Sequence, residues 1–248
     1  MSNIKPTSLK KRYLTKLLSN LTGLAIMLFS TVIITRSLGP ESYGNFSFLN
    51  NFFIQLIPFL TFSTSIAFFT KLSQRNNDFG LVSFFRILSI IGFFILFSII
   101  VFAQVFEITD FLWPKQSIYL VCMAAIFAIL SWVVTSLTHI SDALGITVST
   151  EITKIIQKFI GLLLIIILYY LDLINIFNFY YYNFFILLLL LIAFVFIINR
   201  PDFNFASGWL MSKIQFKKYF NEFYIYSRPL FFYSLIGLIV GLSDRWLL

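Results

Sequence analysis

GLLLIIILYYL at residues 161–171 and FFILLLLLIAFVFII at residues 184–198 are the two stretches that decide the fold of this chain. Strands of a membrane β-barrel alternate apolar and polar residues, and neither stretch has a polar face of that kind. A helix forms its backbone hydrogen bonds within the segment, so it can satisfy these backbones in lipid. The sequence therefore predicts membrane-spanning helices.

The composition of the whole chain supports this prediction. Of its 248 residues, 59% are hydrophobic and 11% are charged, and the mean hydropathy is +0.92, which is far more apolar than a soluble domain requires. About 20 apolar residues are needed to cross ~30 Å of hydrocarbon. Seven runs of this kind are predicted, at residues 14–35, 46–70, 79–106, 118–138, 155–171, 179–198 and 229–248.

These runs predict an all-α integral membrane protein of about seven transmembrane helices. Residues 1–198 would form a six-helix N-terminal transmembrane lobe, residues 199–228 a cytosolic linker, and residues 229–248 the start of a truncated C-terminal lobe. Because the last run stops without a polar tail, we expect the chain to be a partial or truncated product.

Loop charge predicts the orientation. If the N-terminus is cytosolic, all of the 18 Lys and Arg residues except Arg36, Lys115 and Arg245 fall on the cytosolic side or within a run that begins there. Cytosolic loops of membrane proteins carry such an excess of Lys and Arg. The net charge of +8 is thus explained by topology, and nucleic acid is not an expected partner.

The linker contains a predicted amphipathic helix on the inner leaflet. Ser212 and Gln215 have the spacing of a capping box at a helix start. Aromatic residues then recur at helical spacing beside charged ones, namely Phe216, Tyr219, Phe220 and Phe223 beside Lys213, Lys217, Lys218 and Glu222. The alternative is an ordinary basic loop.

A turn motif, TRSLGPESYGNFSF at residues 35–48, follows the first run. Gly39 and Gly44 permit positive φ and Pro40 presets a turn position, which favours a tight connector on the outer side. The motif resembles the corresponding turn of bacterial polysaccharide flippases, the O-antigen type of the multidrug/oligosaccharidyl-lipid/polysaccharide exporter superfamily. Arg36, Leu38, Gly39, Pro40, Glu41, Tyr43 and Gly44 fill the family pattern, and Arg228-Pro229-Leu230 and Ser243-Asp244-Arg245 resemble the family's seventh helix.

The resemblance implies a multi-pass protein of the cytoplasmic (inner) membrane that acts in O-antigen, lipopolysaccharide or other surface polysaccharide biosynthesis. Its expected substrate is an undecaprenyl-diphosphate-linked oligosaccharide. Expected partners are membrane lipids, a glycan polymerase and other polysaccharide assembly proteins. Family members have about twelve spans in two lobes, and the second lobe is nearly absent here.

Cations in the apolar runs are the first candidates for binding the diphosphate, because charged groups in a membrane tend to face a cavity or a partner. Arg86 and Lys158 are the main candidates of this kind, and Arg245 in the seventh run and Arg36 in the turn are further cations. Asp244, beside Arg245, is an acidic candidate for the same substrate site. The alternative for Arg86 and Lys158 is snorkelling to the cytosolic headgroups. For Arg36 it is a purely structural role in the turn.

Asn51, Gln55 and Pro58 fall on one helical face of the second run. The amides would contact sugar in a cavity, or would instead bond to a neighbouring helix. His139 with Asp142 is a lesser candidate, for proton coupling, against an interfacial polar end as the alternative.

No catalytic residue, cofactor or metal site is predicted. The sequence has no phosphate-binding loop or nucleophile elbow, and its only histidine is His139. We expect a transporter rather than an enzyme. The alternatives are a small-molecule cation antiporter of the same superfamily, which would prefer an acidic cavity, and a membrane-embedded glycan polymerase or ligase, which would need a long outer loop.

The predicted orientation can be tested by thiol labelling in a background that lacks Cys122. A cysteine introduced at Ser42 should react with an impermeant reagent added outside the cell, whereas one introduced at Asn76 should react only after the membrane is broken. The opposite labelling pattern would show that the loop charges had been misinterpreted.

Overall fold

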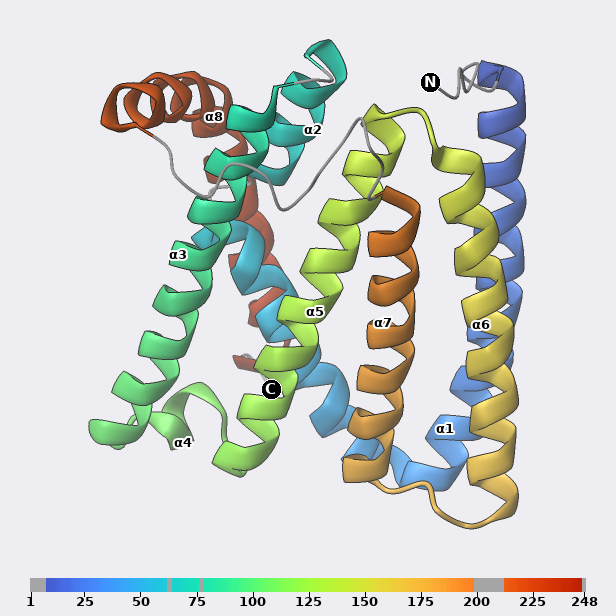
Figure 1. Cartoon of the computed structure of the whole chain (residues 1–248). Coiled ribbons are helices and arrows are strands. Elements are labelled where there is room, and N and C mark those ends of the chain that lie inside the picture. The colour runs from blue at the N-terminus through green and yellow to red at the C-terminus, as the bar shows by residue number, and fades with distance from the viewer. Residues whose placement is uncertain (1–7, 62–63, 76–77, 199–211, 247–248) are drawn as a thin grey trace. The chain divides into compact units, whose positions relative to one another are not determined.

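The structure is a computed structural model, and it describes residues 8–61, 64–75, 78–198 and 212–246. All regular secondary structure in these residues is helical (Figure 1). The helices are α1 (Leu9–Leu60), α2 (Thr64–Gln74), α3 (Phe79–Val105), α4 (Thr109–Leu112), α5 (Ile118–Ala143), α6 (Thr147–Tyr170), α7 (Ile176–Ile198) and α8 (Lys213–Trp246).

Five of the described helices are long and apolar enough to cross a membrane, namely α1, residues Gly80–Val105 of α3, α5, α6 and α7. Large apolar side chains on their outer faces are exposed, for example Leu28 on α1 and Leu163 on α6, as expected where lipid is the solvent. The predicted all-α, multi-pass membrane protein is confirmed. The number of about seven spans stays a prediction, because α1 counts once here and α8 is not among the five.

A single residue interrupts the 52-residue α1 helix. Gly39 has φ 75° and ψ 166°, a conformation that is almost restricted to glycine. Pro40 follows as the first residue of the continuing helix, where its missing amide hydrogen costs no hydrogen bond. The predicted connector at residues 36–45 is therefore helical except at Gly39. Gly44, which would also permit a positive φ, is helical.

The second predicted run, residues 46–70, is also divided. Pro58 cannot donate a backbone hydrogen bond, and α1 ends two residues later at Leu60. Residues 64–70 belong to α2. The run is mostly apolar and contains only scattered polar side chains such as Asn51 and Gln55, so hydropathy alone does not reveal this break.

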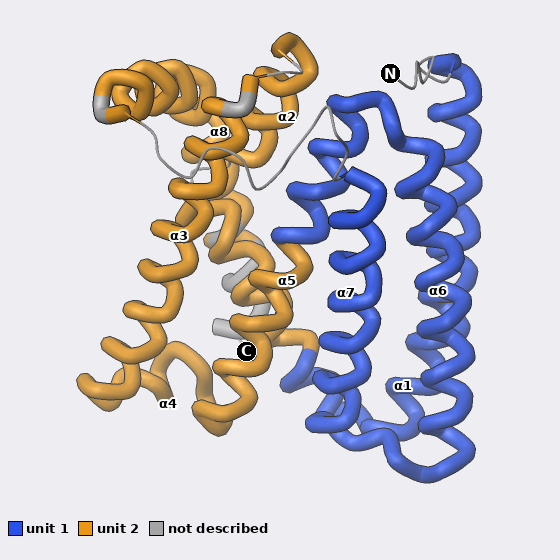
Figure 2. The backbone as a smooth tube through the Cα atoms, viewed as in Figure 1, with its two compact units in different colours: residues 1–46, 133–200 blue, residues 47–132, 201–248 orange. Residues whose placement is uncertain are grey.

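The chain forms two compact units (Figure 2). Unit 1 comprises residues 1–46 and 133–200, and it contains the first part of α1, the end of α5, α6 and α7. Its core joins Ile34 of α1, Ile165 of α6 and Phe179 of α7. The ring of Phe46 closes this core, with its centroid 4.5 Å from that of Phe179. Residues on both sides of Gly39 therefore pack on the same core.

Unit 2 comprises residues 47–132 and 201–248. Here α8 packs against α2 and α3. The predicted aromatic face of α8 surrounds Phe84 of α3, with ring centroids of Phe216, Tyr219 and Phe223 4.9 to 6.0 Å away. The aromatic face thus packs on protein rather than only on lipid.

The start of α8 agrees with the capping pattern. The helix begins at Lys213, and the Ser212 hydroxyl accepts a hydrogen bond from the Gln215 amide at 3.3 Å. One helix then continues through Pro229 to Trp246, so the predicted boundary at residues 228/229 lies inside α8. The predicted linker residues 199–211 lie outside the described residues.

Gly39 should be the position of α1 that tolerates substitution least. We expect Gly39→Ala to lower the free energy of unfolding by about 1 to 3 kcal/mol, because a Cβ atom is strained at this φ and ψ. Thermal unfolding in detergent measures the effect. Gly237→Ala is the matched control, since a Cβ atom there meets no atom within 4 Å. Equal melting temperatures for the two variants would contradict the assigned backbone.

Candidate functional site

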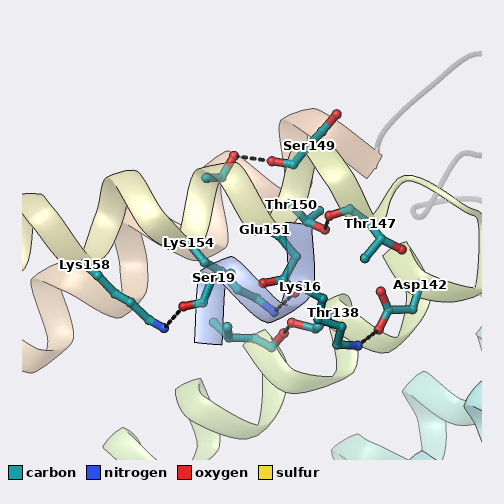
Figure 3. Close-up of polar contacts among 12 residues, drawn as sticks. Lys16, Ser19, Thr138, Asp142, Thr147, Ser149, Thr150, Glu151, Lys154 and Lys158 are labelled. Carbon is teal, nitrogen blue, oxygen red and sulfur yellow. Dashed lines mark hydrogen bonds and ion pairs between the residues drawn. The ribbon is translucent and has the colours of Figure 1, made fainter. Parts of the chain in front are cut away.

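Unit 1 contains a cluster of charged and polar side chains from α1, α5 and α6 (Figure 3). On one side, Lys16 Nζ of α1 lies 2.7 Å from Asp142 Oδ2 of α5. On the other, Lys154 Nζ lies 2.8 Å from Glu151 Oε1, both on α6. We call Lys16, Ser19, Asp142, Glu151, Lys154 and Lys158 the unit 1 polar cluster. Its three lysines outnumber its two carboxylates, so its net charge is positive.

Lys158 is the member that lies deepest along its helix. It is the twelfth of the 24 residues of α6, which begins eight residues before the predicted run at 155–171. The half-buried side chain points toward α1, where Nζ lies 3.4 Å from the backbone carbonyl oxygen of Ser19 (Figure 3). It therefore contacts the neighbouring helix instead of extending along its own helix to the helix end.

Gly23 provides the space for this contact. A Cβ atom at position 23 would overlap Lys158 Nζ and lie within 3.3 Å of two carbons of the same side chain. The overlapping atoms are the far end of a flexible side chain. A side chain at position 23 would consequently displace the ammonium group without disturbing the backbone.

The cluster has hydrogen-bonding capacity that its own members do not use. Glu151 is only 1% exposed, and Lys154 compensates the charge of its carboxylate. The Ser19 hydroxyl and Asp142 Oδ1 are buried and have no hydrogen-bond partner within the described residues. Lys158 Nζ has three donors, of which its contact with the Ser19 carbonyl engages one. The Ser19 hydroxyl and the remaining donors of Lys158 would fit a ligand with acceptor oxygens, whereas Asp142 Oδ1 is itself an acceptor and would need a donor.

The remaining predicted site residues lie elsewhere. Arg36 is exposed on α1, three residues before the break at Gly39. Arg86 is half-buried on α3 in unit 2. Asn51 is exposed and donates to Ser47 Oγ of its own helix at 3.5 Å, and Gln55 is half-buried with Oε1 lacking a partner in the described part of the chain. Asp244 and Arg245 belong to α8, and their side chains lie outside the described set.

Unit 2 contains a second charged cluster, which fixes the start of α8 to the α2–α3 hairpin. Glu222 Oε1 of α8 lies 3.0 Å from Lys71 Nζ and 2.6 Å from Arg75 Nη2. Beside it, the Tyr219 hydroxyl donates to Asp78 Oδ1 at 2.6 Å, and Asp78 also caps α3 by accepting from the Leu81 amide. We call these residues the α8 clamp.

The pKa directions in the α8 clamp agree with its geometry. Burial alone would raise the pKa of Glu222, but the hydrogen bonds from Lys71 and Arg75 outweigh it and hold the pKa below its ordinary value. The hydrogen bond with Glu222 raises the pKa of Arg75. Burial, followed by the hydrogen bond to Asp78, raises the pKa of Tyr219 to about 12. At neutral pH all three groups are therefore in the protonation states that the contacts require.

Several residues of both clusters were missed by sequence reasoning. Glu151 and Lys154 stand at i and i+3, a spacing that could have predicted their ion pair. Asp142 was predicted with His139 for proton coupling, which stays a prediction, and the structure adds an ion pair between its carboxylate and Lys16 of α1. This pair, like Gly23 with Lys158, joins helices that are more than 120 residues apart in the sequence, and no local pattern indicates such contacts.

No protein-family model, curated protein or solved structure matches the chain.

The α8 clamp should weaken when Glu222 loses its charge. We expect Glu222→Gln to destabilise the docking of α8 by about 1 kcal/mol, since a partly exposed ion pair contributes about that much. Amide hydrogen exchange over residues 213–226 should become faster. The pKa of Glu222 is lowered from its ordinary value of 4.5 in the folded chain, so the charged carboxylate stabilises the fold fully above pH 4.5. This stabilisation is lost as the pH falls through the lowered pKa. Glu107→Gln, at an exposed carboxylate, should leave the exchange unchanged.

Proposed function

We propose that this chain belongs to the machinery that flips an undecaprenyl-diphosphate-linked oligosaccharide across the cytoplasmic membrane, as a transporter rather than an enzyme. In this proposal the N-terminus is cytosolic and the product serves surface polysaccharide biosynthesis, such as O-antigen assembly. The loop charges support the orientation. The turn motif around Gly39 and its resemblance to polysaccharide flippases support the substrate class.

The placement of Lys158 is the observation that carries the proposal. A lysine midway along an apolar helix costs free energy, so it is retained where it meets a partner or lines a pathway. Here the ammonium group of Lys158 occupies the space next to Gly23 of α1. Its Nζ atom contacts the carbonyl oxygen of Ser19 rather than a carboxylate. Such a cation can accept an anionic group such as a diphosphate.

The rest of the unit 1 polar cluster suits the same ligand. Its net positive charge favours an anion, while Glu151 and Asp142 are each neutralised by a lysine. The Ser19 hydroxyl can donate to a phosphate oxygen. In the proposed mechanism this cluster holds the diphosphate, the amides of Asn51 and Gln55 contact sugar, and the polyprenyl chain remains in lipid. Alternating access would arise from the movement of two lobes, as in other transporters built from repeats.

The two alternative functions receive less support. A cation antiporter would need carboxylates available for the ion, and both carboxylates of the cluster are already paired with lysines. A glycan polymerase or ligase would need a long outer segment for catalysis. The connections expected on that side, residues 106–117 and 171–175, are short in the described structure.

The proposal predicts that Lys158 and Gly23 control binding of a polyprenyl diphosphate. We expect Lys158→Met to weaken binding of undecaprenyl diphosphate to the purified chain by about tenfold, because a charge-assisted hydrogen bond is lost. Gly23→Ala should weaken it in the same direction by displacing Nζ. Native mass spectrometry with titrated lipid measures both effects, and Gly237→Ala serves as the control.

Three outcomes of this titration would count against the proposal. Unchanged binding in Lys158→Met would remove Lys158 from the site. Binding that weakens only in proportion to a loss of thermal stability would make Lys158 structural. Stronger binding of Na⁺ in Lys158→Met would favour the antiporter. Arg86→Gln in the same assay tests whether the second predicted cation contributes separately.

A further inference from the structure

Unit 2 contains a cavity between α2, α3 and α8 that the proposed transport mechanism does not use. Its volume of about 410 Å³ lies within the ~300–1,000 Å³ range of small-molecule sites. Most of its lining is apolar and aromatic, and the α8 contribution extends from Phe220 to Phe232. The complete lining is Thr64, Leu88, Phe220, Phe223, Tyr224, Ser227, Arg228, Phe231 and Phe232. We call it the α8 cavity.

Two polar side chains in the lining are buried without a partner. Thr64 of α2 and Ser227 of α8 are each 3% exposed. Neither hydroxyl oxygen has a hydrogen-bond partner within the described residues. Buried hydroxyl groups are normally satisfied, and leaving one unsatisfied costs free energy. Both hydroxyls line a cavity that is large enough for a ligand, so ligand oxygens can supply the missing bonds.

Arg228 adds a positive charge to the same cavity. It is exposed, follows Ser227 directly, and forms no ion pair with a carboxylate in the part of the chain that the structure describes. Arg228 also lies at the boundary between the charged and the apolar part of α8. Charged residues precede it from Lys217 to Glu222, and the apolar stretch begins at Pro229. Arginine at the end of an apolar segment is a typical neighbour of lipid headgroups.

We propose that the α8 cavity binds one anionic phospholipid. The phosphate lies at Arg228, whose guanidinium group matches phosphate oxygens. The hydroxyls of Ser227 and Thr64 donate to phosphate or ester oxygens. One acyl chain lies along the aromatic side chains Phe223, Phe231 and Phe232. The site is separate from the unit 1 polar cluster and does not depend on the function proposed for that cluster.

The combination of groups favours this ligand over others. A soluble anion would use Arg228 but would leave the aromatic lining uncovered. An uncharged lipid would fill the lining without engaging the guanidinium group. An anionic phospholipid satisfies the apolar surface, the two hydroxyls and the charge together, and it is abundant at the depth where α8 becomes apolar.

Native mass spectrometry of the purified chain tests the proposal. The probes are dioleoyl phosphatidylglycerol, dioleoyl phosphatidylcholine, dihexanoyl phosphatidylglycerol and inorganic phosphate. We expect retention of one dioleoyl phosphatidylglycerol and weaker retention of the other three. Arg228→Gln should reduce its affinity about tenfold through the lost charge-assisted bond. Lys217→Gln, which removes an exposed cation of α8 outside the cavity, should not change it.

A double variant separates the hydroxyls from the charge. Thr64→Val with Ser227→Ala keeps the approximate shape of the side chains and removes both unsatisfied hydroxyls. The lipid-free variant should therefore have a melting temperature no lower than that of the parent chain. It should bind both dioleoyl lipids more weakly than the parent chain does. Equal retention of phosphatidylglycerol by Arg228→Gln and Lys217→Gln would overturn the proposal. The proposal would also be overturned if inorganic phosphate bound as tightly as phosphatidylglycerol. It would likewise be overturned if a second copy of the chain occupied the cavity and excluded the lipid.

Discussion

Hydrogen bonding of the backbone in lipid is the constraint on which the structure depends. Hydrocarbon offers no partner for an amide or carbonyl group, so the apolar segments form helices and depart from them only where a residue permits it. The same constraint governs small polar side chains. Thr35, Ser98 and Thr138 each donate to the carbonyl oxygen four residues earlier in their own helix. Such hydroxyls are satisfied locally and place no demand on neighbouring helices.

Longer charged side chains can pair within one helix, as Glu151 and Lys154 do, but several of them reach a partner on another helix. In unit 1, Lys16 and Asp142 join α1 to α5, and Lys158 joins α6 to α1. In unit 2, Glu222 receives two cations and joins α8 to α2 and the α2–α3 turn. The few charged residues of this apolar chain thus add specific links between helices. Where the bonding remains incomplete, as at Lys158 and Arg228, a ligand can complete it.

Much of the fold could be predicted from hydropathy alone. Runs such as residues 179–198 predicted α7 closely, and the capping pattern at Ser212 predicted the start of α8. Hydropathy failed at the breaks. Hydropathy cannot tell that residues 36–45 form a helix broken only at Gly39, which has a positive φ, rather than a ten-residue loop. It also cannot tell that residues 46–70 are divided between α1 and α2 rather than forming one continuous helix. The candidate site was predicted only in part. Lys158 was found as a cation in an apolar run, whereas Gly23 and Ser19 became relevant only through tertiary contact.

The absence of a side chain at Gly23 links two positions that are far apart in the sequence. The volume missing at position 23 is the volume that the end of Lys158 occupies. Among proteins that share this helix pair, a larger residue at position 23 should therefore occur together with a shorter residue at position 158. The signature of the site across evolution would be covariation of the two positions, and neither would need to be invariant. A substitution at one position would become tolerable in the background of a change at the other.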